Sequence, residues 1–283
     1  MRLVRFSSNG GAPQLGITNG RAVTSIVGKI DNAPTEMINL IKDWDHFRDA
    51  LATISVFEIP LSEVSLHAPV ARPGKIMGIG LNYADHAAEA GLDTPADQMW
   101  FSKAVTCVNG PFDPIERPLV SAALDYEAEL VIILGKGGRH LDKAAAQKAI
   151  FGYCVGNDVS VRDWQVKTSQ FVLGKSFDTH APFGPWIVTA DEIDPADLQI
   201  ASYVNGEKRQ SSRTSQLIFS CTDQVELLSK VMTLEPGDVL FSGTPGGVGA
   251  AMKPPTWLVP GDVVKVEIEG IGAIENVVVD ETN

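Results

Sequence analysis

A strand-like stretch at residues 124–134 carries three acidic side chains inside an otherwise apolar run. Branched aliphatic residues fill its second half, and a glycine cluster that begins at Gly135 ends it, a pattern typical of a β-strand. Side chains alternate between the two faces of a strand, so Glu127 and Glu129 are expected on one face, about 7 Å apart. Two ionised carboxylates in this arrangement repel each other unless a cation lies between them.

A second predicted strand, at residues 153–158, ends in another acid, Asp158. Carboxylates on neighbouring strands form an all-oxygen site that suits a hard divalent cation, so Mg²⁺ or Mn²⁺ is favoured over Zn²⁺, with Ca²⁺ as a further candidate. We therefore interpret Glu127, Glu129 and Asp158 as candidate metal ligands. The alternative is that acids at alternate positions mark the solvent-facing side of a sheet.

Length and composition limit the kind of protein that carries this site. A chain of 283 residues with 44% hydrophobic and 20% charged residues is expected to be globular, with one domain or one domain plus a small addition. Its net charge of -12 argues against nucleic acid and anionic membrane surfaces as partners. The cysteines match no zinc or disulfide spacing, and we see no signal-peptide core and no apolar run long enough to span a bilayer. We expect a cytoplasmic protein.

The fold class is predicted to be α+β and mostly β, without a regular βαβ series. Asn19-Gly20 predicts a hairpin, and apolar residues at helical spacing predict a helix within residues 34–53. A proline-rich loop at 60–73 predicts a boundary between a small N-terminal α/β module, residues 1–70, and a catalytic domain, residues 71–283. Turn dipeptides predict an irregular chain between residue 100 and the central strand. Asp142 is expected to cap an alanine-rich helix.

His86 and Glu89 are three residues apart in a segment with helix-forming residues, so a helix would place them on one face. A carboxylate in this position can hold the imidazole in one tautomer and raise its basicity, which a general base requires. The alternative is an ordinary ion pair on a helix surface.

Other polar residues predict contacts with an anionic substrate. Lys175, between a glycine and a serine, can supply a fixed positive charge, and the Gln165 amide can donate to a developing oxyanion. A glycine-rich loop at 241–249 lacks the ending of a phosphate-binding P-loop, but its backbone N–H groups and a threonine hydroxyl suit a carboxylate. The alternatives are a solvated lysine, a packed glutamine and a turn without a ligand. The candidate substrate contacts are Tyr83, Arg162, Gly243 and Thr244.

These motifs together resemble the fumarylacetoacetate hydrolase family. The matching blocks, in chain order, are residues 80–89, 125–130, 152–165 with 174–179, and 242–249. They cover most of the chain from residue 75 to 279, whereas the N-terminal module is only loosely similar. One departure is His180, which stands where an aromatic or apolar residue is commoner in the family.

The resemblance implies a β-roll or sandwich-like core, a homodimer, and a divalent metal held by the three candidate acids. It also implies that His86 and Glu89 lie on a lid, from residue 82 to about 95, that orders when substrate binds. Substrates in the family are 2-oxo acids with a second carbonyl. The resulting expectation is a hydrolase of acylpyruvates or diketo acids. In it, His86 activates water, Gln165 and Lys175 stabilise the oxyanion, and the metal stabilises the enolate that leaves.

Two alternatives remain open. The same site could decarboxylate an oxaloacetate-type 2-oxo acid or isomerise an enol, which needs a stabilised enolate but no attacking water. The chain could also be a ligand-binding relative without activity. The presence of all three acids and of the His86–Glu89 pair argues against that second alternative.

Overall fold

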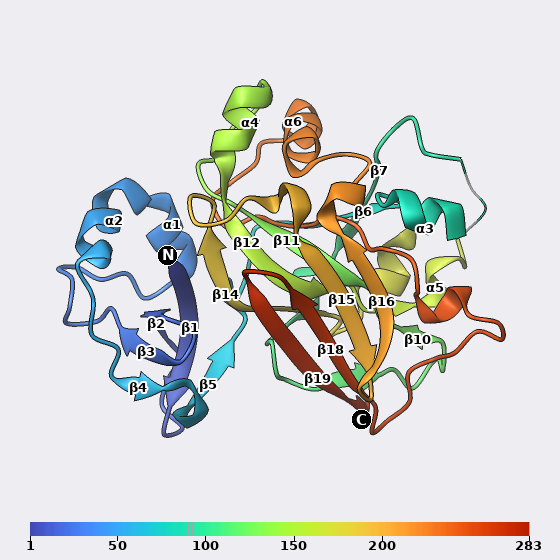
Figure 1. Cartoon of the computed structure of the whole chain (residues 1–283), viewed down its shortest axis with the longest axis horizontal. Helices are drawn as coiled ribbons and strands as arrows, with labels where there is room; N and C mark the ends of the chain where they lie inside the picture. Colours follow the sequence, from blue (N-terminus) through green and yellow to red (C-terminus); the bar gives the residue numbers. More distant parts are fainter. Residues whose placement is uncertain (90, 92, 283) are drawn as a thin grey trace.

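The computed structural model describes residues 1–89, 91 and 93–282, and it is built mainly from β-strands (Figure 1). The larger sheet has the strand order β4-β3-β2-β1-β14-β12-β11-β17-β6-β7, with β5 paired to β1 and β8 paired to β14. Its strands are β1 (Arg2–Ser8), β2 (Gln14–Thr18), β3 (Ala22–Ser25), β4 (Ile59–Pro60), β5 (Val64–His67), β6 (Ile76–Gly80), β7 (Met99–Lys103), β8 (Val108–Asn109), β11 (Ala128–Leu134), β12 (Ile150–Asn157), β14 (Ala181–Thr189) and β17 (Val239–Phe241).

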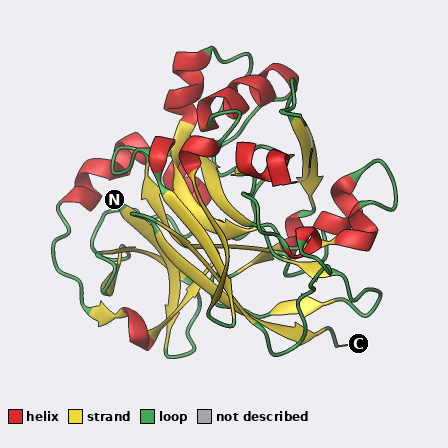
Figure 2. Cartoon of the chain, turned by 45° about the vertical axis from the view of Figure 1, so that its right-hand side comes forward, coloured by secondary structure: helices red, strands yellow, loops and turns green. Residues whose placement is uncertain are grey.

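A smaller sheet, in the order β16-β15-β18-β19-β9, packs across β11 and β12 of the larger one. The 45° turn between Figures 1 and 2 shows the strands of the two sheets crossing at an angle, as in a sandwich. The expected mostly β, α+β class with a sandwich-like core is confirmed. The remaining strands are β9 (Ile115–Arg117), β15 (Gln199–Val204), β16 (Glu207–Arg213), β18 (Val263–Ile268) and β19 (Gly272–Asp280), and a separate short pair, β10 (Leu124–Asp125) and β13 (Ser160–Val161).

The central strand β11 is buried on both faces, which explains its continuous apolar run. Leu130 and Ile132 belong to the core shared with the smaller sheet. Val131 and Ile133 point the other way and pack in the core that includes α1 and α2. An antiparallel register places Ala128, the first residue of β11, opposite the last residue of β12, so β11 begins beside the end of β12.

The helices lie around the sheets (Figure 2). The predicted helix within residues 34–53 is two helices, because the chain leaves helical geometry at Asp43, whose φ is -104° and ψ 27°. Asp142 caps its helix as expected, accepting a hydrogen bond from the Ala145 backbone N–H at 2.8 Å. No helix in the described part of the chain is long and apolar enough to cross a membrane. The helices are α1 (Met37–Lys42), α2 (Trp44–Ala52), α3 (Ala84–Glu89), α4 (Lys143–Ala149), α5 (Arg162–Gln165) and α6 (Cys221–Val231).

The N-terminal strands are continuous with the larger sheet. The hairpin predicted at Asn19 joins β2 and β3, and the Asn19 side chain accepts hydrogen bonds from the next turn residues. Strand β1 then pairs with β14, from the C-terminal half of the chain. The predicted domain boundary near residue 70 stays a prediction.

Candidate active site

The acidic residues converge where β11 begins and β12 ends. The predicted strand at 124–134 is interrupted, so that Glu127 lies between β10 and β11 while Glu129 lies within β11. Asp158 follows β12, and its backbone N–H donates to the Glu127 carbonyl at 2.9 Å. One carboxylate oxygen from each of Glu127, Glu129 and Asp158 lies within 4.8 Å of the others. All three residues are buried, with at most 6% exposed, so they are not the solvent-facing side of a sheet.

The electrostatics of this trio fit a divalent cation. Burial, then the neighbouring carboxylates of Asp158 and Glu127, raises the pKa of Glu129 well above its usual value. Burial also opposes ionisation of Glu127, but the Lys175 ammonium and the Arg162 guanidinium lower its pKa to about 2. A cation among the three carboxylates would relieve the repulsion that Glu129 experiences. Their all-oxygen donor set suits a hard divalent metal ion.

Two basic side chains, buried Lys175 and half-buried Arg162, pair with these acids. Lys175 Nζ lies 2.7 Å from both Glu127 Oε2 and Asp158 Oδ2. Arg162 Nη1 lies 2.6 Å from Glu127 Oε1. The segment that carries Lys175 packs closely on α5, because a Cβ at Gly174 would meet the Gln165 backbone nitrogen at 2.3 Å. The basic candidates for substrate binding and the acidic candidates for metal binding therefore form one hydrogen-bonded cluster.

The predicted dyad lies on α3, which docks against the glycine-rich loop. His86 Nδ1 is 3.4 Å from Glu89 Oε2, and the two side chains are 17% and 33% exposed. Both Glu89 oxygens also accept the Gly247 backbone N–H at 3.0 Å. Asn82, just before α3, exchanges hydrogen bonds with the Phe219 backbone and donates to the Ser242 carbonyl. The carboxylate that orients His86 is thus itself held by the loop.

A cavity of about 200 Å³ joins these groups. Six of the candidate residues line it: His86, Glu127, Arg162, Gln165, Lys175 and Thr244. Its apolar wall includes Met99, Phe101 and Phe171. Glu89 and Asp158 are one contact away, in hydrogen bonds to His86 and Lys175 of the lining, and Glu129 also lies outside the lining.

Two candidate substrate contacts lie elsewhere. The Tyr83 side chain is fully buried in the hydrophobic core and does not line the cavity, because the packed interior encloses its aromatic ring. Gly243 also does not line it, but its backbone N–H donates to Glu129 Oε2 at 2.6 Å. Its φ is +104°, and a Cβ added to it would lie 2.7 Å from Asn82 Cβ, so this position is restricted to glycine.

Comparison with known proteins agrees with this geometry. Residues 75–279 match the family model for the fumarylacetoacetate (FAA) hydrolase C-terminal domain. The chain belongs to the fumarylacetoacetate hydrolase family. It is 40% identical to the oxaloacetate tautomerase FAHD2A of Bos taurus over 289 residues, covering 99% of this chain and 92% of that protein.

Solved structures of the family share the whole fold. A fumarylacetoacetate hydrolase from Exiguobacterium antarcticum superposes with a TM-score of 0.84 at 38% identity, covering 99% of this chain and 100% of the other. A maleylpyruvate hydrolase from Sphingobium sp. SYK-6, in complex with a manganese(II) ion and pyruvate, has a TM-score of 0.84 at 33% identity, with 100% of each chain covered. The family therefore includes both tautomerases and hydrolases.

Sequence reasoning missed three buried residues that form hydrogen bonds or ion pairs with the candidate site residues. Lys103 Nζ lies 2.5 Å from Asp158 Oδ1. It sits on β7, in the stretch expected to be irregular, where the apolar Trp100 and Phe101 could have signalled a strand. Asp125 accepts from the Arg162 side chain and from the Gly249 N–H.

Gln210 is the third missed residue, and it positions Thr244. Its amide donates to the Thr244 hydroxyl and to the Pro245 carbonyl, each at 2.8 Å. Its oxygen accepts from the Ala128 N–H, next to the acidic cluster. A polar residue inside a strand-like segment carries no signal of such contacts in the sequence.

His180, the departure from the family pattern, lies outside the cavity lining. It is completely buried, with Nε2 2.8 Å from the Glu116 carbonyl oxygen. Burial lowers the pKa of His180 to about 3, so its imidazole is neutral and donates through Nε2. His180 therefore stabilises the fold and does not contact a ligand in the cavity.

Proposed function

We propose that this protein catalyses keto–enol tautomerisation of a small 2-oxo acid of the oxaloacetate type. The observation that carries the proposal is the 40% identity to an oxaloacetate tautomerase over 99% of this chain. This is the enol-isomerase alternative that the sequence left open, and the comparisons support it better than the expected hydrolase. The small cavity, about 200 Å³, suits a substrate of few atoms.

The charges of the site favour an anionic substrate. Among the described residues, Asp125, Glu127, Glu129 and Asp158 are matched by Lys103, Arg162 and Lys175 in one buried network. With a divalent cation added and all acids ionised, the network carries one surplus positive charge, which a substrate carboxylate would neutralise. Glu127, Glu129 and Asp158 would hold the cation, Mg²⁺ or Mn²⁺, which when bound polarises the 2-oxo group and acidifies the adjacent C–H.

The proton transfer is assigned to His86. Its imidazole, held by Glu89, takes the proton from the carbon beside the 2-oxo group while the electron pair of that C–H bond forms the carbon–carbon double bond. His86 then returns the proton to the former carbonyl oxygen, so substrate and enzyme both finish with the same number of protons. Gln165, Lys175 and Thr244 line the same cavity and can donate hydrogen bonds to that oxygen as its charge develops.

Hydrolysis of an acylpyruvate is the second candidate, supported by the 33% identity to a maleylpyruvate hydrolase. There His86 would instead take a proton from water, and the hydroxide would attack the distal carbonyl. The apolar wall of Met99, Phe101 and Phe171 is a feature of the cavity that suits an uncharged distal group.

Parallel assays with Mg²⁺ separate the two candidates. We expect enol oxaloacetate to be converted faster than an acylpyruvate is hydrolysed, and His86→Ala to lower kcat for tautomerisation roughly 10²–10⁴-fold. His46→Ala, at an exposed histidine on α2, is the matched control and should leave kcat unchanged. Rapid hydrolysis without tautomerisation would reverse the ranking, and a fully active His86→Ala would overturn the assignment of the base.

A further inference from the structure

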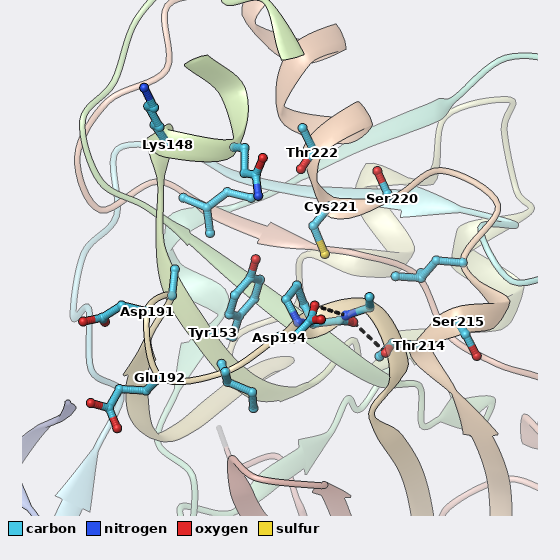
Figure 3. A pocket seen from close by; sticks show the side chains of 17 residues that line it. Lys148, Tyr153, Asp191, Glu192, Asp194, Thr214, Ser215, Ser220, Cys221 and Thr222 are labelled. Atoms are coloured by element: carbon cyan, nitrogen blue, oxygen red, sulfur yellow. Dashed lines mark hydrogen bonds between the residues drawn. The ribbon is translucent and has the colours of Figure 1, made fainter. Parts of the chain in front are cut away.

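A second and larger cavity, of about 1030 Å³, lies between the end of α4, the start of α6 and the loop that follows β14 (Figure 3). Its volume is that of a site for a small organic molecule. The apolar part of its lining includes Ile150, Leu217 and the ring of Tyr153. None of the groups assigned to the active site lines it.

The Tyr153 hydroxyl gives the wall of this cavity a polar anchor. Only 4% of Tyr153 is exposed, and Figure 3 shows its hydroxyl pointing into the cavity, in the space between Lys148 and Cys221. Among the hydrogen bonds of the described residues none involves this hydroxyl, so it is free to bind a group that enters the cavity. Burial, with Cys221 and Asp194 nearby, raises the pKa of Tyr153, so the hydroxyl stays protonated and can donate.

The rim of the cavity is acidic. Asp191, Glu192 and Asp194 line it, and Figure 3 shows the Lys148 ammonium pointing away from Tyr153. The Met1 amino group lies 3.3 Å from Glu192 Oε1 and partly neutralises the charge of that carboxylate. Asp194 accepts a hydrogen bond from the Ala196 N–H and pairs with no cation among the described residues. An exposed carboxylate without a cation, close to this hydroxyl, favours a ligand with a positive charge.

The wall of this cavity also holds the segment 217–220, which precedes α6 and is hydrogen-bonded to Asn82, just before α3. Leu217 and Ser220 line the cavity, and the residues between them bond to Asn82. The Ile218 N–H donates to the Asn82 carbonyl and the Phe219 N–H to the Asn82 side chain, each at 2.8 Å. A ligand that fixes residues 217–220 therefore also fixes the start of α3, which carries His86.

We propose that this cavity binds a small organic cation, an ammonium group on an apolar body, and that its occupancy stabilises the docked position of α3. The ammonium would lie between Asp194 and the Tyr153 hydroxyl, and the apolar body against Ile150 and Leu217. This role is independent of the reaction proposed above, because it concerns binding at a separate cavity.

Binding of 2-phenylethylamine, measured by calorimetry on the full chain, tests the site. We expect it to bind more tightly than 2-phenylethanol, its neutral counterpart, and 3-phenylpropanoate not to bind. Asp194→Asn keeps the acceptor for the Ala196 N–H and should weaken the amine about two- to fivefold, the effect of an exposed ion pair, without affecting the alcohol. Asp197→Asn, in the same loop but outside the cavity lining, is the control. Equal affinity for all three compounds, or no binding of the amine, would overturn the site.

Hydrogen exchange tests the link to α3. Saturating 2-phenylethylamine should slow exchange of the amides in residues 84–89, and Tyr153→Phe should weaken both amine binding and this protection. Tyr203→Phe, at a partly exposed tyrosine outside the cavity, should change neither. Unaltered exchange in α3 with the amine bound would overturn the coupling, whatever reaction the active site performs.

Discussion

At the scale of single residues, the site is a network in which buried charges are paired with charges of opposite sign. Lys175, 1% exposed, bridges Glu127 and Asp158, and Lys103 holds the other oxygen of Asp158. Removing one member of such a network leaves an uncompensated buried charge, which costs about 3–5 kcal/mol. Glu129 differs from the others, because its hydrogen-bond donor is the backbone N–H of Gly243.

Glu129→Gln should therefore abolish metal binding without unfolding the protein. The amide oxygen can still accept the Gly243 N–H, so we expect a change in unfolding free energy of less than about 1 kcal/mol. We expect the affinity for Mn²⁺, measured by calorimetry, to fall by more than about 100-fold, since the lost group is a ligand. Glu275→Gln, at an exposed glutamate on β19, controls for the charge change. Retained Mn²⁺ affinity in Glu129→Gln would remove this residue from the ligand set.

His180 predicts a pH dependence of stability. Burial lowers the pKa of His180 to about 3 from a usual value of 6.5. The unfolded chain takes up a proton as the pH falls below 6.5, whereas the folded chain does not until about pH 3. The contribution to stability is therefore complete above pH 6.5 and is lost as the pH falls, by up to about 1.4 kcal/mol per pH unit. Urea unfolding between pH 7 and 4 should show a shallower loss in His180→Phe than in the wild type, and parallel curves would contradict this.

That Glu127, Glu129 and Asp158 lie together could be predicted from the sequence, because two of them are two residues apart and the third ends the next predicted strand. The roles of Lys103 and Gln210 could not be predicted. Their hydrogen-bond partners are 55 and 82 residues away, and the sequence does not show which strands become neighbours. Tyr83 is the converse case. It lies in a matching block close to His86, yet its side chain is packed in the core, and the order of residues in a motif does not show which of them face the cavity.

At the scale of elements, α3 is short and attached by few contacts. It spans six residues, and it is held by Glu89 on the Gly247 N–H and by the Ser212 hydroxyl on Asp85. A helix of this length is unstable without such contacts. The expected lid, residues 82 to about 95, includes Ala90 and Leu92, which lie outside the described residues.

We expect α3 to open and close, and to be held closed by a bound anion. Oxalate with Mg²⁺ should slow hydrogen exchange of residues 84–89, because a closed cavity favours the docked helix. Exchange in α4, which has its own N-cap, should not respond. In the Glu89→Ala variant, which lacks the contact with Gly247, the amides of α3 should exchange faster with or without oxalate. Equal protection in all these states would show that α3 is not a lid.

At the scale of the whole molecule, one core crosses the predicted boundary near residue 70. Leu3, Leu15 and Ile17 pack in the same cluster as Val131 and Ile133 of the central strand. Packing shared in this way predicts that the two parts unfold together, although the sequence composition alone favours a linker between them.

Leu15→Ala tests this shared core. Leu15 is 1% exposed, so its truncation should lower the unfolding free energy by about 2–5 kcal/mol. We expect one transition in urea, with coincident curves from far-UV and near-UV circular dichroism. Gln14→Ala, at the neighbouring half-buried position, should have a much smaller effect. Two separate transitions would establish the N-terminal part as an independent domain.

The pairing of β1 with β14 has a consequence for biosynthesis. Arg2 is opposite Val188, so the first strand leaves the ribosome long before its partner has been translated. Until then β1 can pair with β2 along one edge and with β5 along residues 5–8 of the other, but the edge at Arg2 and Leu3 remains open, and an open edge can pair with another chain. Contacts this distant along the chain also slow the search for the native state. Nascent chains of this protein are therefore expected to depend on chaperone protection until β14 emerges and closes the sheet.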